Sequence, residues 1–123
     1  GVKRGIKLPV SAPFHCSLME TAAHAMAQAL GDTPPANPTI ALYANVTASK
    51  VTSGEEEQAL LVEQVTGRVR WRESVAAMHA DGIGHFVELG GKVQAPQNKK
   101  IVGEAAATSL VSMEDLEGFA KSL

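Results

Sequence analysis

The stretch that decides the fold reads Leu8-Pro9-Val10-Ser11-Ala12-Pro13-Phe14-His15-Cys16-Ser17-Leu18-Met19. Apolar residues alternate along its first half, as in a half-buried strand, at Leu8, Val10 and Ala12. Two prolines keep the chain extended and delay helix formation until Pro13 is passed. Ser17 and Glu20 have the spacing of a capping box, so a helix is predicted to begin at about Ser17. His15 therefore lies at a strand-to-helix junction, where α/β sheets place their ligand sites.

Helical and strand-like patterns alternate along the rest of the chain. Apolar residues recur with a helical period in the segments 17–30, 53–67, 71–80 and 112–123. Strand-like runs lie at 39–46, 85–89 and 107–111. The run at 39–46 is mostly apolar, which is typical of a buried parallel strand. This alternation predicts an α/β fold with a mainly parallel sheet and flanking helices.

Two further serines mark helix starts. Ser53 with Glu56 forms a second capping box, and Ser112 with Asp115 begins the last helix, whose apolar residues are expected to face inward. The segment 92–102 carries Pro96 among polar residues, so it is interpreted either as a surface helix or as an irregular loop.

Composition narrows the class of protein. A chain of 123 residues with 45% hydrophobic residues suits one small globular domain. The net charge of −2 gives no electrostatic argument for nucleic acid, and no apolar run approaches the ~20 residues of a membrane helix. The one cysteine excludes an intramolecular disulfide framework and fits a reducing cytosol, so a cytoplasmic location is expected.

Four motifs together resemble one enzyme family. Pro13-Phe14-His15, followed by a small residue, Ser17 and Leu18-Met19, resembles the active-site histidine segment of malonyl-CoA:acyl carrier protein transacylases. Three later pieces follow in the family's order, Ala44-Asn45-Val46-Thr47, Leu61-Val62-Glu63-Gln64 and Val69-Arg70-Trp71-Arg72-Glu73-Ser74-Val75. The resemblance covers only the C-terminal part of the family's domain. We therefore interpret residues 1–123 as part of an α/β-hydrolase-like acyltransferase domain, with 1–12 as the end of its smaller subdomain.

The resemblance also implies a function, an [acyl-carrier-protein] S-malonyltransferase of fatty acid biosynthesis. A serine would take malonyl from coenzyme A and pass it to the phosphopantetheine thiol of acyl carrier protein, without a metal or redox cofactor. His15 would be the general base, and the backbone carbonyl of Gln64 would orient its ring, so Gln64→Ala is expected to be mild. Phe14 would crowd an α-methyl group of the acyl chain, which favours malonyl. Asn45 would bind substrate or support the histidine site.

The sequence also limits this reading. It contains no G-x-S-x-G, so the chain alone is expected to be inactive and to need the missing N-terminal half of the domain as a partner, besides acyl carrier protein. Cys16 is a poor nucleophile candidate beside His15, because neighbours on an extended chain point to opposite faces. His15 as an ordinary capping histidine and Phe14 as simple core packing remain open. Two other functions also remain: a polyketide-type acyltransferase, and a non-catalytic module that self-associates through a sheet edge.

Overall fold

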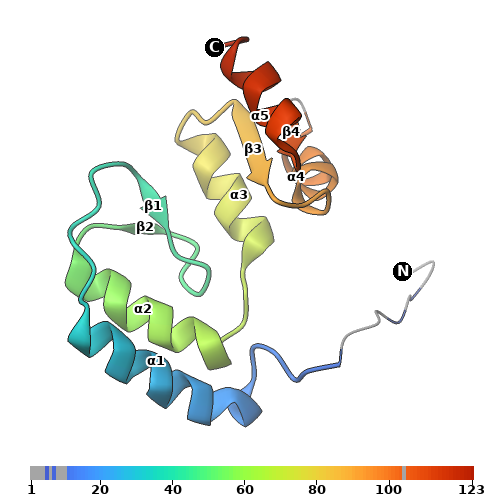
Figure 1. The fold of residues 1–123 in the computed structure, drawn as a ribbon. Helices are drawn as coiled ribbons and strands as arrows, with labels where there is room; N and C mark the ends of the chain where they lie inside the picture. The colour runs from blue at the N-terminus through green and yellow to red at the C-terminus, as the bar shows by residue number, and fades with distance from the viewer. Residues whose placement is uncertain (1–4, 6, 8–10, 104) are drawn as a thin grey trace.

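The computed structural model describes residues 5, 7, 11–103 and 105–123. Within them, the chain forms two groups of elements that Figure 1 shows as the two arms of an open arc. The strand predicted at 8–12, and with it the assignment of 1–12 to a smaller subdomain, falls mainly outside the described residues.

The first arm is a helical pair with a small hairpin. A short 3-10 turn, Ser17–Met19, leads into α1 (Glu20–Asp32), and α1 packs beside α2 (Gly54–Thr66). Between them in sequence lie β1 (Leu42–Tyr43) and β2 (Lys50–Val51), which pair antiparallel. The start of α2 lies so close to the loop after α1 that a Cβ on Gly54 would be 2.1 Å from the carbonyl oxygen of Pro35. Only glycine fits that contact.

The second arm is a βαβ unit flanked by two more helices. It runs through α3 (Trp71–Ala80), β3 (His85–Leu89), α4 (Gln94–Val102), β4 (Ala106–Leu110) and α5 (Met113–Ala120). β3 and β4 pair in parallel, with His85 opposite Ala106 and Leu89 opposite Leu110. The helix α4 that crosses between them packs on both strands and on α3.

Glu88 ties this unit together. Its carboxylate is buried and accepts hydrogen bonds from the first amides of α4, those of Val93, Gln94 and Ala95, at 3.0–3.1 Å. The Ser109 hydroxyl donates to the same carboxylate from β4 at 3.1 Å. These hydrogen bonds, with the Ala95 amide contributing most, lower the pKa of Glu88 to about 2. A carboxylate on a helix N-terminus satisfies amides that have no partner within the helix.

Much of the predicted architecture is confirmed. The fold class is α/β with flanking helices and a parallel strand pair, and the helix 71–80 and the strand 85–89 agree residue for residue. Ser53 and Ser112 accept hydrogen bonds from the amides three residues on, and Ser112 with Asp115 forms a complete capping box. The segment 92–102 is helical from Gln94, and Pro96 lies in the first turn, where a missing amide costs nothing.

Three expectations are wrong. The run 39–46 is not a buried parallel strand, because the chain turns back after Ala44 and β1 pairs antiparallel with β2. Ser17 does not cap α1: it lies inside the 3-10 turn, and Cys16 precedes that turn without a side-chain cap. The last helix buries only part of its predicted apolar side: Phe119 is half-buried against the ring of His85, but Met113 is 70% and Leu116 41% exposed.

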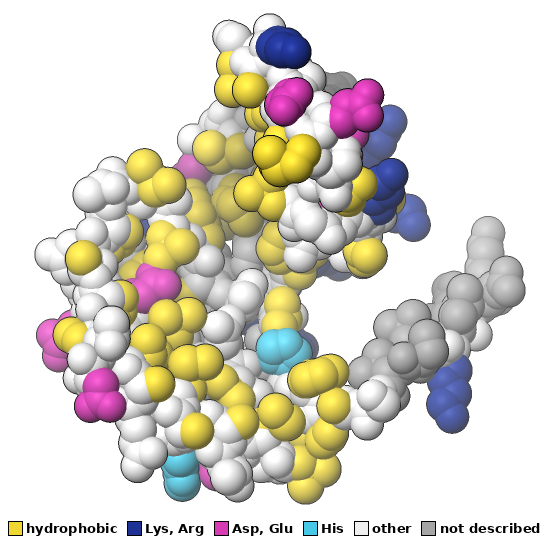
Figure 2. Space-filling model, in the orientation of Figure 1, with side chains coloured by type: hydrophobic (Ala, Val, Ile, Leu, Met, Phe, Trp, Pro, Cys, Tyr) yellow, Lys and Arg dark blue, Asp and Glu magenta, His cyan; other side chains and the backbone are white. Residues whose placement is uncertain are grey.

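The chain exposes much apolar surface. Among the described residues, Ile40 is 82%, Leu18 77% and Leu89 72% exposed. Figure 2 shows hydrophobic side chains spread along both arms and around the hollow between them. Among the described helices, none is both long and apolar enough to cross a membrane.

Candidate active site

His15 has an unusual backbone conformation. Its φ is 56°, in the left-handed region, and it lies in the turn that precedes the 3-10 segment. A residue with a Cβ pays roughly 1–2 kcal/mol for that conformation. Strain of this kind is common at functional sites, where the surrounding structure must hold it in place. The turn presents the imidazole on the surface, where it is accessible to a reactant.

Within the described part of the chain, the imidazole has one hydrogen-bond partner. Nδ1 of His15 lies 2.8 Å from the backbone carbonyl oxygen of Gln64. A carbonyl oxygen only accepts, so in this contact Nδ1 carries the proton and Nε2 keeps its lone pair. Gln64 is available because it lies in the last turn of α2, whose carbonyls have no donor within the helix. The contact joins two of the sequence motifs and has the geometry of an oriented general base.

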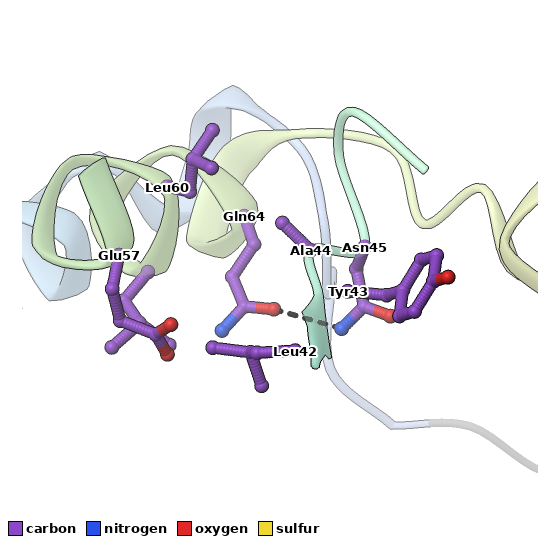
Figure 3. A pocket seen from close by; sticks show the side chains of 8 residues that line it. Leu42, Tyr43, Ala44, Asn45, Glu57, Leu60 and Gln64 are labelled. Atoms are coloured by element: carbon purple, nitrogen blue, oxygen red, sulfur yellow. Dashed lines mark hydrogen bonds between the residues drawn. The ribbon is translucent and has the colours of Figure 1, made fainter. Parts of the chain in front are cut away.

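The side chain of Gln64 is held as well. Its Oε1 accepts a hydrogen bond of 2.9 Å from Nδ2 of Asn45, drawn as the dashed line in Figure 3. Both residues border a cavity of about 180 Å³ between the hairpin and α2. The sequence analysis gave Gln64 a role through its backbone carbonyl and did not predict this side-chain contact. Asn45 is linked to the imidazole through Gln64: it binds the side chain of Gln64, whose backbone carbonyl oxygen contacts His15.

Phe14 and Cys16 flank the histidine differently. Phe14 is 61% exposed, so it does not belong to the core formed by the described residues. The thiol of Cys16 donates to the carbonyl oxygen of Pro13 at 3.1 Å, which closes the turn around His15. The structure thus gives Cys16 a local role in the turn.

The other histidines belong to separate places. His24 lies on α1 beside Glu20, His79 faces the carbonyl oxygen of Ile83, and His85 contacts the Thr108 hydroxyl. Over the described residues, no three or more His, Cys, Asp or Glu side chains group as metal ligands would.

Sequence reasoning missed Arg70. Its backbone amide donates to the carbonyl oxygen of Asn45 at 2.8 Å, and its Nη1 donates to that of Thr47 at 3.0 Å. Arg70 lies within the fourth motif, at 69–75, which served only to establish the resemblance. The one sequence feature that could have pointed to Arg70 is its position as a long, charged residue directly before the predicted helix 71–80.

Three positive side chains and one acidic side chain, Glu73, line a groove near the start of α3. Arg68, Arg72 and Lys100 border it together with Trp71, and the groove has a volume of about 510 Å³. Such a groove suits phosphate groups, which guanidinium and ammonium groups bind by charge and hydrogen bonding.

Comparisons with known proteins agree with these motifs. No protein-family model matches the chain. It is 39% identical over 120 residues to a malonyl CoA-acyl carrier protein transacylase of Haemophilus influenzae, which covers 97% of this chain and 38% of that protein. An acyl-carrier-protein-S-malonyltransferase structure from Bartonella henselae superposes with a TM-score of 0.86 at 40% identity, over 98% of this chain and 38% of that one.

A third match is a complex. It is a type II polyketide acyl-carrier protein with its malonyl-transacylase, matched at a TM-score of 0.88 and 31% identity over 100% of this chain and 40% of that one. The chain is therefore similar, in sequence and in fold, to the C-terminal portion of malonyl CoA-acyl carrier protein transacylases. It spans about 38% of the length of the first of these relatives.

Proposed function

We propose that this chain carries the general base of an [acyl-carrier-protein] S-malonyltransferase of fatty acid biosynthesis. The observation that supports the proposal most directly is the 2.8 Å contact between Nδ1 of His15 and the carbonyl oxygen of Gln64. It leaves Nε2 of an exposed, strained histidine free to take a proton. The similarity to transacylases over 97% of the chain gives that base a reaction.

The proposed reaction has two symmetrical halves. Nε2 of His15 takes the proton of a serine hydroxyl as that oxygen attacks the malonyl thioester of coenzyme A. The proton then passes to the departing sulfur, which leaves coenzyme A as a thiol and malonyl as a serine ester. In the second half His15 takes the proton of the phosphopantetheine thiol of acyl carrier protein, whose sulfur attacks the ester. The proton returns to the serine oxygen, and no metal or redox cofactor is needed.

The serine belongs to a partner in this proposal. The chain has no G-x-S-x-G and spans only about 38% of its relative's length, so the N-terminal half of the domain would bring the nucleophile. The exposed apolar side chains of both arms favour such a covering partner, because isolated soluble chains rarely expose so many. The chain by itself should be inactive, since removing the nucleophile of such a site costs on the order of 10⁶ in rate.

Acyl carrier protein is the proposed acceptor. A relative of similar fold was solved with its carrier protein. On this chain, the groove bordered by Arg68, Arg72 and Lys100 offers cations to the phosphates of coenzyme A or of the phosphopantetheine arm. In this proposal Phe14, which directly precedes the base and is exposed, contacts the acyl group. We place the reaction in the cytosol, in agreement with the single cysteine.

A second candidate is an acyltransferase of polyketide synthesis. The carrier protein in the matched complex is of that type. The same base and the same chemistry serve both functions, so the acceptor distinguishes them. Transfer to a fatty-acid carrier protein but not to a polyketide carrier protein would favour the first.

The test is transfer of labelled malonyl from coenzyme A to acyl carrier protein. The chain is assayed alone and mixed with a separately made N-terminal half that carries the serine. We expect activity only in the mixture, and its loss with His15→Ala but not with His24→Ala, a histidine exposed on α1. Turnover by the chain alone, or a mixture indifferent to His15→Ala, would refute the proposal.

A further inference from the structure

The turn between β1 and β2 contacts Gln64. In this turn, the amide of Ala48 donates to the carbonyl oxygen of Ala44 at 2.9 Å, and Ala48 has φ 56°. The turn is therefore closed on itself and projects Asn45 toward the last turn of α2. Asn45 is half-buried and its Nδ2 holds the Gln64 side chain at 2.9 Å.

Arg70 fixes the same turn from the other arm. Its amide and its guanidinium bind the carbonyl oxygens of Asn45 and Thr47, at 2.8 and 3.0 Å. Its own carbonyl oxygen accepts from the amide and the hydroxyl of Ser74, a residue only 2% exposed in α3. Arg70 is thereby anchored to a buried part of the second arm. A hydrogen bond from a charged donor is stronger than a neutral one.

The end of α2 lies tightly against this turn. A Cβ added to Gly67 would lie 2.9 Å from Cγ1 of Val46 and 2.9 Å from the carbonyl oxygen of Glu63. The turn and the end of α2 are therefore closely packed at Gly67, three residues after Gln64.

We propose that Arg70 and Asn45 are positioning residues for His15 and act through Gln64. The inference rests on the proposed function for its importance to catalysis, but not for its geometry. A helix end frays readily, and the last turn of α2 carries the one oxygen that orients the imidazole. Asn45 clamps the side chain of that residue, and Arg70 clamps Asn45. Loss of either clamp lets the carbonyl swing, and the Nδ1–H form of His15 loses its selective stabilisation.

The tautomer of His15 is the direct readout. It is measured by nitrogen-15 NMR on the ring of this chain, at a pH where the imidazole is neutral. The wild-type protein should hold the proton on Nδ1. Asn45→Ala, Gln64→Ala and Arg70→Met should each lower the ratio of Nδ1–H to Nε2–H, by about fivefold for one lost hydrogen bond. Arg70→Lys, which keeps a charged donor, should recover part of the ratio.

Two controls lie in the same elements. Arg72→Met removes an exposed cation two residues from Arg70, and Gln58→Ala removes a glutamine from α2 about one and two-thirds turns before Gln64. Both should leave the ratio unchanged. An unchanged ratio in Asn45→Ala and Arg70→Met would overturn the proposal. A wild-type imidazole that is mainly protonated on Nε2 would also overturn it, and that measurement does not depend on any variant being folded.

Asn45→Ala, Arg70→Met and His15→Ala in the reconstituted transfer assay separate this inference from the function. If His15→Ala abolishes transfer while the ratio of Nδ1–H to Nε2–H is unchanged in Asn45→Ala and Arg70→Met, the proposed function is supported and the positioning role is refuted. If the tautomer responds but no mixture transfers malonyl, the positioning role stands and the function falls. With both correct, Asn45→Ala and Arg70→Met lower kcat more than they raise KM.

Discussion

The strain at His15 can be measured by replacing the residue in two ways. His15→Ala and His15→Gly both delete the imidazole and its contact with Gln64, so the difference between them isolates the backbone. At φ 56°, alanine keeps a cost of roughly 1–2 kcal/mol, which glycine does not pay. Glycine instead pays roughly 0.5–1 kcal/mol of extra conformational entropy on folding. The midpoints of these two ranges predict that the free energy of unfolding of His15→Gly is about 0.75 kcal/mol higher than that of His15→Ala.

Urea denaturation followed by circular dichroism measures that difference. A gap of that size is a severalfold change in the unfolding equilibrium. The matched control is Ala27→Gly on the exposed side of α1, where glycine should instead destabilise by about 0.5–1 kcal/mol. If His15→Ala proves as stable as His15→Gly, or more stable, the left-handed backbone is not a source of strain and the reasoning fails. Neither variant should support transfer.

Three further predictions address packing, pH and specificity. Gly54→Ala should lower the free energy of unfolding by about 1–3 kcal/mol, because its Cβ would meet the carbonyl oxygen of Pro35 at 2.1 Å. The control Gly31→Ala lies in α1 with open space around it and should be neutral or stabilising. Equal urea midpoints for the two variants would refute the clash. The pKa of Glu88 is lowered from 4.5 to about 2, so the stabilisation by its carboxylate is complete above about pH 4.5 and is lost as the pH falls toward 2. Glu88→Gln should therefore flatten the dependence of the free energy of unfolding on pH between these values. An unchanged dependence would contradict the role of Glu88. Phe14→Ala should raise methylmalonyl relative to malonyl transfer in the reconstituted enzyme by about 10–200-fold, the value of one methyl contact; an unchanged ratio would leave Phe14 without a role in selectivity.

The parts of the fold that follow from neighbouring residues were predictable. The helix at 71–80, the strand at 85–89 and the caps at Ser53 and Ser112 depend on periodicity and on side chains within three residues of the helix start. The failures have a different cause. The spacing of Ser17 and Glu20 is a valid cap pattern, but the chain turns at His15 with φ 56°, and Ser17 lies inside the 3-10 turn that follows instead of capping it.

The strand at 39–46 failed for a related reason. Its apolar run fits a parallel strand, yet the turn after Ala44 closes with Ala48 at positive φ, a conformation that alanine seldom adopts and that no sequence pattern indicates. The chain then returns as β2 and pairs antiparallel. Similarly, periodicity assigned an inward face to the last helix, but the described residues cover only part of it: Phe119 packs against the ring of His85, while Met113 and Leu116 stay exposed.

For the site, the sequence by itself determined which residue types are available and, through four motifs in order, the family that they resemble. It placed His15 at a helix start and Gln64 in the last turn of another helix, because such signals are local. Only the tertiary structure decided that these two residues, 49 positions apart, meet at 2.8 Å. It also decided that Asn45 binds the side chain of Gln64 and that Arg70 in turn binds the backbone of Asn45. Contacts of that range depend on how the helices pack and how each turn closes, and these arise from the summed interactions of many residues rather than from any short pattern.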